Sequence, residues 1–385
     1  MSRKTGEAGA DPVQTAQEVY EKAAEQLGRA NIAVVGSSGV GKSTLINAMF
    51  GFDIAKTGVG RRVTEEIAYY EHPTGAVGFF DTRGIEVGEA KAQLIEGFRS
   101  LVVERRSRDQ SEQIHVAWYC LRAASARFVD ADAEIVQALH DAGVPVIVVL
   151  TQAARRDGRI HPVALELAHS IEAQGLPLAP DGRVFFVMAV ADEFEGHERH
   201  GLEDLLDATF RVAPEAVHRA LIAGQVIDLE RKEKASRKIV QAASATAATA
   251  GAVPIPFSDA AALVPLQVGM FAGVTVTYGL PISKGTFVTL AGAALSYGGL
   301  TTAGKYLVTN LLKLVPGGNI AGGAIRAGVA GTLTLTAGEA WIVVCNQLAR
   351  MDPERLARLD ASEVRDMFMQ AFESRAKRLP PDTGE

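Results

Sequence analysis

Apolar runs with the length of β-strands recur along the first half of the chain, and segments with helically spaced apolar residues lie between them. The strand candidates are NIAVVG (31–36), EIAYYE (66–71), AVGFF (76–80), IHVAWYC (114–120), VPVIVVL (144–150) and RVFFVM (183–188). Helices are predicted to begin near Lys42, Glu89, Asp130, His161 and Gly201. Continuously apolar strands that alternate with helices are typical of a mostly parallel sheet covered on both faces. The pattern predicts an α/β domain over residues 31–212.

Helical spacing continues on both sides of this domain. An amphipathic helix is expected over residues 11–27, within an N-terminal segment 1–30. Residues 213–238 predict one connector helix that starts near Pro214, and residues 239–348 a separate all-α domain. The last segment, 349–385, is expected to hold an amphipathic helix over residues 353–379 and a frayed tail.

Charge is distributed unevenly along the 385 residues. Charged residues make up 22% of the chain, yet residues 239–338 hold five: Asp259, Lys284, Lys305, Lys313 and Arg326. Uncharged runs over 260–283 and 285–304 are each long enough, as helices, to cross a bilayer core. Basic residues flank this charge-poor block on both sides, so we expect membrane association by an even number of crossings or a hairpin. Its many Ala, Gly and Thr residues equally suit a compact soluble bundle, which is the alternative.

The remaining composition narrows the function classes. With 39 Lys and Arg against 45 Asp and Glu, the net charge of -6 argues against general nucleic-acid binding, and no nucleic-acid partner is expected. Two cysteines, Cys120 and Cys345, are too few for a disulfide framework and suit a reducing compartment. The segment MSRKTGEAGADP lacks the apolar core of a secretory signal, so a cytoplasmic location is expected.

A glycine-rich segment joins the first predicted strand to the first predicted helix. Residues 36–43, GSSGVGKS, fit the pattern G-x-x-x-x-G-K-[ST] in the required strand-loop-helix context. Such a loop lets several backbone N–H groups converge on phosphate oxygens. Lys42 is expected to contact β- and γ-phosphates and Ser43 to place its hydroxyl on Mg²⁺, the alternative being a mere connecting turn. The residues predicted to bind a nucleotide here are Gly36, Ser37, Ser38, Gly39, Val40, Gly41, Lys42, Ser43 and Thr44.

A second motif follows the strand AVGFF. Asp81-Thr82-Arg83-Gly84 has the form D-x-x-G, in which the acid can hold Mg²⁺ through water and the glycine amide can meet a γ-phosphate. Alone, this pattern more often marks a surface turn. One strand pair after a phosphate loop, it indicates the γ-phosphate side of the same site.

Together these motifs resemble a P-loop GTPase of the translation-factor-related class, near the Era-like and immunity-related GTPases. The resemblance covers residues 31–210 and implies a P-loop NTPase fold, GTP or GDP as ligand, and Mg²⁺. In that family a threonine before the second strand closes over the metal, and TGVGRRVTEEIAYYE places Thr64 there, unless it only opens an edge strand. The resemblance implies Thr64, Asp81 and Gly84 as catalytic residues and Ser43, Thr64 and Asp81 as metal ligands.

The base-recognition loops depart from that family. Its fifth strand ends in Asn/Thr-Lys-x-Asp, whose aspartate accepts two hydrogen bonds from guanine, whereas this chain reads Thr151-Gln152-Ala153-Ala154. Thr151 and Gln152 remain as predicted nucleotide contacts, and Asp157 is a carboxylate that could swing in. The last loop, Ala-Val-Ala-Asp at 189–192, lacks the usual Ser-Ala-Lys and leaves backbone contacts. Guanine specificity is the part of the resemblance with least support.

The catalytic side departs as well. Ile85 follows D-x-x-G where Ras-like proteins carry the Gln that orients water, and Gly39 stands where K⁺-dependent relatives have an Asn. Slow intrinsic hydrolysis is expected unless a partner, a second copy, or an arginine stabilises the transition state. Arg83 and Arg127 are the candidates, although an arginine in the position of Arg127 is more often a solvated loop residue.

The segment VPIPFSDAAALVPLQVGM (253–270) resembles the uncharacterised domain of bacterial GTPases of the YcjF-like group, over residues 237–348. That domain is often described as membrane-associated. Both resemblances imply a GTPase switch whose nucleotide state controls a helical domain on the cytoplasmic face of the inner membrane. Membrane lipid and a homodimer or oligomer formed through the G domain are the implied partners. The alternatives are a dynamin-like membrane-remodelling or self-assembling scaffold, in which hydrolysis only resets assembly, and a less supported permeation unit.

Overall fold

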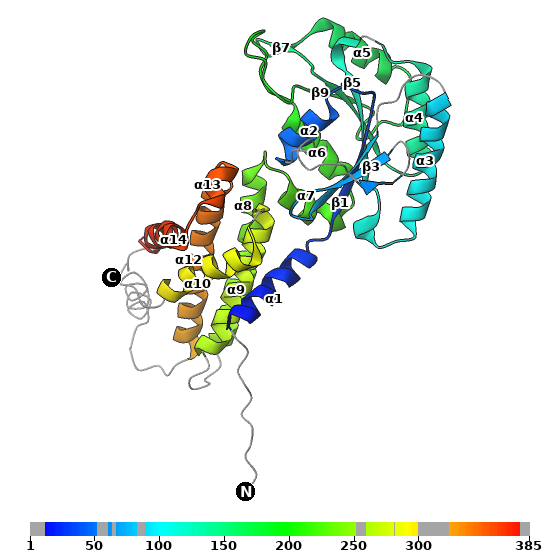
Figure 1. Cartoon of the computed structure of the whole chain (residues 1–385). Coiled ribbons are helices and arrows are strands. Elements are labelled where there is room, and N and C mark those ends of the chain that lie inside the picture. The colour runs from blue at the N-terminus through cyan, green and yellow to red at the C-terminus, as the bar shows by residue number, and fades with distance from the viewer. Residues whose placement is uncertain are drawn as a thin grey trace. The chain divides into compact units, whose positions relative to one another are not determined.

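The computed structural model describes residues 12–51, 61–63, 67–82, 89–125, 127–251, 259–280, 282–298 and 323–377. The chain folds as two compact units (Figure 1). The α/β unit is Leu27–Asp228, and the helical unit joins Met1–Gln26 to Leu229–Glu385. The N-terminal helix expected before the first strand therefore belongs to the helical unit, although the α/β unit follows it directly in the sequence.

A sheet of seven described strands forms the centre of the α/β unit, in the order β2-β3-β4-β1-β5-β6-β9. Its strands are β1 Ala30–Val35, β2 Arg61–Arg62, β3 Ile67–Glu71, β4 Val77–Thr82, β5 Val116–Arg122, β6 Val146–Thr151 and β9 Val184–Val187. β1 pairs in parallel with β4 and β5, β5 with β6, and β6 with β9, whereas β3 is antiparallel to β2 and β4. The predicted mostly parallel sheet is confirmed. The hairpin of β7 (Arg155–Arg156) and β8 (Arg159–Ile160) is an addition that the sequence pattern did not predict.

Helices cover both faces of the sheet (Figure 1). On one face lie α3 (Glu89–Arg106), α4 (Asp130–Asp141) and α5 (Pro162–Glu172). On the other lie α2 (Lys42–Phe50), α6 (Leu202–Val212) and α7 (His218–Gly224). Neighbouring residues of β5 point to opposite faces, as the period of a strand requires. Tyr119 joins the core beneath α3, α4 and α5, whereas Trp118 stacks on Phe50 of α2 and donates its Nε1 hydrogen to Thr209 of α6 at 3.1 Å.

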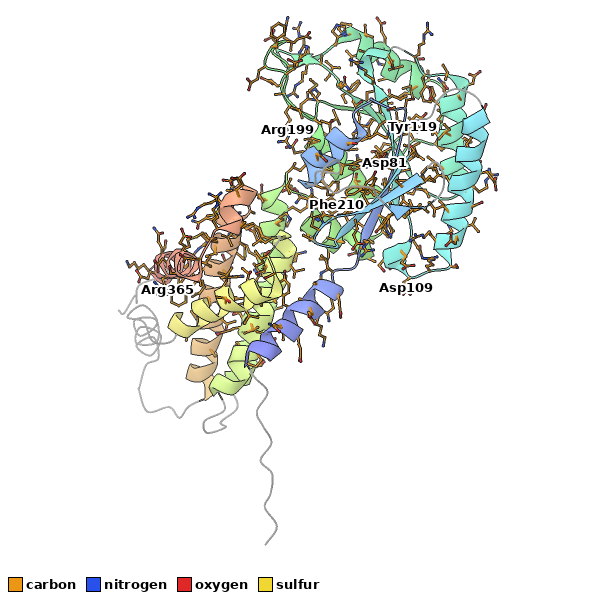
Figure 2. All side chains as sticks on the ribbon, in the orientation of Figure 1. Asp81, Asp109, Tyr119, Arg199, Phe210 and Arg365 are labelled. Carbon is orange, nitrogen blue, oxygen red and sulfur yellow. The ribbon has the colours of Figure 1, made fainter. Side chains whose placement is uncertain are left out.

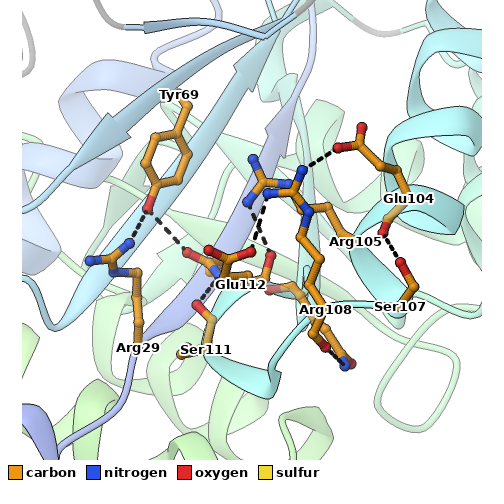
Figure 3. Close-up of polar contacts among 10 residues, drawn as sticks. Arg29, Tyr69, Glu104, Arg105, Ser107, Arg108, Ser111 and Glu112 are labelled. Carbon is orange, nitrogen blue, oxygen red and sulfur yellow. Dashed lines mark hydrogen bonds and ion pairs between the residues drawn. The ribbon is translucent and has the colours of Figure 1, made fainter.

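A polar network closes the edge of the sheet at which β1 begins (Figure 3). Arg29 donates to the Tyr69 hydroxyl at 3.1 Å and to the Glu71 carboxylate at 2.7 Å. The Tyr69 hydroxyl in turn lies 3.5 Å from Oδ1 of Asn31. Gly78 leaves room for this pair, because a Cβ atom there would lie 2.3 Å from the Asn31 oxygen and 2.4 Å from the Tyr69 oxygen. Side-chain hydrogen bonds thus hold the sheet together at the end where β1 begins. The glycine-rich loop lies at the other end, where β1 ends.

In the helical unit, the described elements are helices that pack around an aromatic core. Its described helices are α1 Pro12–Glu25, α8 Leu229–Gly251, α9 Asp259–Tyr278, α10 Lys284–Gly298, α12 Gly323–Leu348, α13 Pro353–Ala357 and α14 Ala361–Ala376. Phe271 of α9 stacks on Trp341 of α12 with ring centroids 4.7 Å apart, and Phe368 of α14 meets both rings edge-on. Tyr20 of α1 stacks on Phe287 of α10 at 4.7 Å. The predicted all-α C-terminal domain is confirmed.

Two groups of charged residues tie these helices together. Lys232 of α8 is 1% exposed, and its Nζ donates to the carbonyl of Tyr278 at 2.9 Å, where α9 ends and its carbonyls carry partial negative charge. Glu339 of α12 lies between Arg237 of α8, at 3.7 Å, and Arg375 of α14, at 3.4 Å. These charged side chains, which lie outside residues 239–338, therefore link helices of the unit to one another.

No helix in the described part of the chain combines the length and the apolar character needed to span a membrane. Of the charge-poor block, residues 252–258, 281 and 299–322 lie outside the description.

The segment that leads out of the α/β unit differs from the single helix predicted over residues 214–238. α7 ends at Gly224 and α8 begins at Leu229, and the fully buried Gln225 occupies the turn between them. Its Oε1 accepts the N–H groups of Ile227 at 2.8 Å and Asp228 at 2.7 Å. A side chain that satisfies these amides removes the need for helical hydrogen bonds, so the chain turns.

The helix predicted over residues 353–379 is likewise two helices, α13 and α14. Asp360 begins the second one, because its Oδ1 accepts the N–H groups of Ser362 at 2.7 Å and Glu363 at 2.9 Å. A carboxylate in this position caps a helix start, which the apolar spacing alone did not reveal.

Candidate nucleotide site

The glycine-rich loop runs from the end of β1 to the first turn of α2. Gly36, Gly39 and Gly41 all have positive φ angles, of 147°, 75° and 100°. A Cβ atom on Gly36 would lie 2.3 Å from the carbonyl oxygen of Cys120 in β5. Other residues would be strained at these angles or would collide there, so the loop shape depends on glycine.

Lys42 begins α2 and is 7% exposed. Its Nζ donates to the carbonyls of Gly36 at 2.8 Å and Ser37 at 3.1 Å, and lies 3.9 Å from Oδ1 of Asp81. The lysine therefore bridges the loop and the end of β4. Its charge is held over the loop, in position to meet an anion there.

A cavity of about 440 Å³ lies against this lysine. Its lining residues are Ser38, Gly39, Gly41, Lys42, Ser43, Thr44, Asp81, Thr82 and Gln152. The structure thus brings the predicted phosphate loop and Asp81 together around one space. Thr82 was missed by the sequence reasoning, although it directly follows Asp81 in the D-x-x-G motif.

Asp81 lies inside the α/β unit, at the end of β4 (Figure 2). Its Oδ1 is buried and has no hydrogen-bond partner within the described residues. Burial raises the pKa of this carboxyl from 3.8 to about 6, although the charge of Lys42 opposes the shift. A buried carboxylate oxygen without a donor suits a hard cation, and the Ser43 hydroxyl lines the same cavity. These residues therefore fit Mg²⁺.

The raised pKa of Asp81 predicts a stability effect in protein free of metal and nucleotide. The folded chain binds a proton more tightly than the unfolded chain, so stability is lost as the pH rises from about 4 through 6. We expect Asp81→Asn to raise the free energy of unfolding by about 1–3 kcal/mol at pH 7.5, and the gain to vanish below pH 4. Urea denaturation of both proteins at several pH values measures the difference. A difference that does not change with pH would contradict this account of Asp81.

A second cavity, of about 510 Å³, adjoins the first and shares Gly41, Thr44 and Gln152 with it. Its other lining residues are Leu45, Thr151, Val187, Met188, Ala189, Val190, Ala191, Asp192 and Glu193. The buried Thr151 hydroxyl lies 2.5 Å from the carbonyl of Val40 and 3.0 Å from that of Leu121, so it fastens the glycine-rich loop to β5 and β6. Both predicted contacts, Thr151 and Gln152, line this space.

Other sequence candidates lie elsewhere. Thr64 and Gly84, with Arg83 and Ile85, fall outside the described residues. Asp157 lies in the turn of the β7–β8 hairpin and lines a third cavity of about 1230 Å³, which shares Gln152 with both nucleotide cavities and includes neither Lys42 nor Asp81. Arg127 is exposed ahead of α4 and lines neither nucleotide cavity. Asp157 therefore lines neither of the two cavities beside the glycine-rich loop.

Two family models match this chain. Residues 31–152 match a 50S ribosome-binding GTPase, and residues 220–372 match a domain of unknown function, DUF697. Among curated relatives, GTPase Era of Stenotrophomonas maltophilia (strain K279a) is 25% identical over 190 residues, 48% of this chain and 56% of that protein. GTPase Era of Xanthomonas axonopodis pv. citri (strain 306) gives the same identity and coverage. The chain spans about half the length of the curated relatives it matches.

Solved structures resemble about half of the chain. A probable GTP-binding protein engB is 20% identical with a TM-score of 0.34, covering 48% of this chain and 98% of its own. Toc33 from Arabidopsis thaliana in complex with Mg²⁺ and GMPPNP is 18% identical with a TM-score of 0.33, covering 54% and 93%. The two family models confirm the sequence resemblance over the residues they match, a P-loop GTPase domain at 31–152 and the DUF697 domain at 220–372.

Proposed function

We propose that this protein binds GTP and GDP with Mg²⁺, hydrolyses GTP, and passes the nucleotide state to its helical unit. One observation carries the proposal. A glycine-rich loop, a buried lysine and a carboxylate oxygen without a hydrogen-bond partner converge on one cavity of about 440 Å³. That combination suits a phosphate chain with its counter-ion.

Each residue of the cavity has a distinct part in this proposal. The loop amides and Lys42 bind and orient the β- and γ-phosphates, and Lys42 also stabilises the ionised form of Asp81. Ser43 and Asp81 would hold Mg²⁺, which supplies positive charge to the phosphate oxygens when bound. The residue after the D-x-x-G motif, where Ras-like proteins carry the Gln that orients water, is Ile85. Slow turnover without a partner is the consequence.

The route to the helical unit begins at the other end of α2. This helix starts with Lys42, and near its end the carbonyl of Met49 accepts the N–H of Val226 at 2.9 Å. A Cβ atom on Gly51, the residue after the helix, would lie 3.1 Å from a Val226 methyl. Val226 follows Gln225, which holds the last residues before α8. A movement of α2 on phosphate binding would therefore displace Val226, close to the point where the chain leaves the α/β unit.

Hydrogen exchange of the full chain tests both parts of the proposal. We expect Mg²⁺ with a non-hydrolysable GTP analogue to protect the backbone amides of residues 36–44 and to change the exchange rates in α8 and α9. In a separate activity assay, we expect the chain to hydrolyse GTP. Gln225→Ala should keep the protection of the loop and lose the change in α8 and α9, because the turn is no longer held. Protection of the loop without any change in α8 or α9 of the natural sequence would remove the coupling and leave the binding intact.

The proposal also includes contact of the helical unit with a membrane and self-assembly of the chain. The charge-poor composition of residues 239–338 and its basic flanks support contact with lipid. Phe194, which is 99% exposed, and Val190, which is 58% exposed, support assembly through the α/β unit. Flotation with liposomes and sedimentation, each with and without nucleotide, separate these ideas. A chain that stays monomeric and does not float under any condition would remove both.

A further inference from the structure

The cavity of about 510 Å³ beside the phosphate loop must read the base if the chain distinguishes nucleotides. Guanine presents two donors side by side, the ring N1–H and the 2-amino group, where adenine has none. A carboxylate, which carries only acceptors, is the side chain that matches both donors. At position 154 this chain has alanine, which offers no acceptor in its side chain. The acceptor has to come from another lining residue.

Most polar side chains of the cavity are poorly suited to accept both hydrogen bonds from guanine. The buried Thr151 hydroxyl gives its hydrogen to backbone carbonyls and offers one oxygen, whereas guanine presents two donors. Thr44 offers one hydroxyl, and Gln152 offers one acceptor beside a donor. The carboxylates on the lining are Asp192 and Glu193. Glu193 is exposed and makes no hydrogen bond within the described residues, so binding would have to fix a free side chain.

Asp192, by contrast, is held in place by four hydrogen bonds. Its backbone N–H and C=O pair with His197 at 2.9 Å each, in an antiparallel bridge. Its Oδ1 accepts the N–H groups of Phe194 and Glu195, both at 3.1 Å. Within the described residues no donor is paired with Oδ2. The side chain is half-buried, so one carboxylate oxygen is fixed in the turn and the other stays available.

We propose that Asp192 reads the guanine base through Oδ2, and so supplies the carboxylate that position 154 lacks. This inference rests on the proposed function, since it concerns the base of the same nucleotide. The preorganised turn means that little side-chain freedom is lost on binding. Oδ2 keeps two lone-pair directions, enough for N1–H and the 2-amino group together.

Asp192→Asn is a sharp test because it changes one atom in a held side chain. The asparagine oxygen can still accept the amides of Phe194 and Glu195, which turns its NH₂ group to the place of Oδ2. An acceptor for the base thus becomes a donor. That donor opposes the 2-amino group of guanine and matches the oxygen that xanthine carries in its place.

The measurement is equilibrium binding of GTP, ITP, XTP and ATP, each with Mg²⁺, to the full-length chain. In the natural sequence we expect GTP to bind about tenfold or more tightly than ITP, which lacks the 2-amino group. Asp192→Asn should weaken GTP by roughly 10- to 100-fold, remove the preference over ITP and strengthen XTP. Affinity for ATP should not fall, because the phosphate contacts are unchanged and the new donor faces the acceptor N1 of adenine.

Glu193→Gln is the matched control, since it neutralises the other lining carboxylate, and it should leave all four affinities unchanged. The inference is overturned if Asp192→Asn binds GTP, ITP and XTP as the natural sequence does, or if Glu193→Gln produces the change instead. Failure of the proposed function looks different, because the natural sequence would then bind none of the four nucleotides.

Discussion

Lys42→Ala is expected to lower the affinity for Mg²⁺·GTP by at least about 100-fold, close to complete loss of binding. Lys42 is 7% exposed and its ammonium group lies between two loop carbonyls and Asp81. Truncation removes the one buried cation of the described cavity and leaves the Asp81 carboxylate without its partner. Phosphates would then meet a site of net negative charge. Isothermal titration with GTP and GDP measures the loss.

The control for Lys42→Ala is Ser38→Ala in the same loop. Ser38 lines the cavity and is exposed, and its contribution to phosphate binding comes from the backbone, which alanine keeps. We expect its affinity to stay within a few-fold of the natural value. Circular dichroism and thermal unfolding show whether Lys42→Ala is folded. A folded Lys42→Ala protein that still binds GTP with near-natural affinity would rule out the phosphate role given to this lysine.

Trp341→Ala is expected to destabilise the helical unit by about 3–5 kcal/mol. Trp341 is fully buried, stacks on Phe271, and donates its Nε1 hydrogen to the Thr275 hydroxyl at 3.0 Å and to the Phe271 carbonyl at 3.2 Å. Its removal leaves a cavity between α9, α12 and α14. The melting temperature of this unit should fall by roughly 10 °C.

GTP binding should survive in Trp341→Ala, because every residue lining the two nucleotide cavities belongs to the α/β unit. Hydrogen exchange resolves the two units and shows which of them opens. Leu335→Ala, on the same helix but 36% exposed, is the control and should change the melting temperature little. Simultaneous unfolding of both units in Trp341→Ala would contradict their independent cores.

Much of the α/β unit could be predicted from local sequence. The apolar strands are buried on both faces, so each reads as a continuous hydrophobic run, and the helix starts fall within a residue of the predicted ones. The phosphate loop is equally legible, because Gly36 and Gly41 meet backbone requirements that other residues cannot satisfy. These features depend on residues that are neighbours in the sequence, so the sequence alone predicts them.

The rest depends on contacts between distant residues. The pattern of residues 214–238 is helical, and only the buried side chain of Gln225 turns the chain there. The two-residue strands β7 and β8 are too short for periodicity to reveal them. In the sequence, nothing distinguishes Asp192 from other loop carboxylates. Its backbone bridge to His197 and the two hydrogen bonds that its side chain accepts appear only in the structure. The conformation at such positions depends on which residues pack against them, and a single sequence does not reveal these packing partners.

The placement of α1 has a consequence for the order of events during synthesis. This helix precedes the whole α/β unit, yet Tyr20 stacks on Phe287, and α1 packs on α9 and α10, more than two hundred residues later in the chain. On the ribosome, its apolar face therefore emerges before α9 and α10 and stays uncovered until the α/β unit between them has been made. A fragment that begins at Leu229 would likewise expose the rings and aliphatic groups that α1 covers.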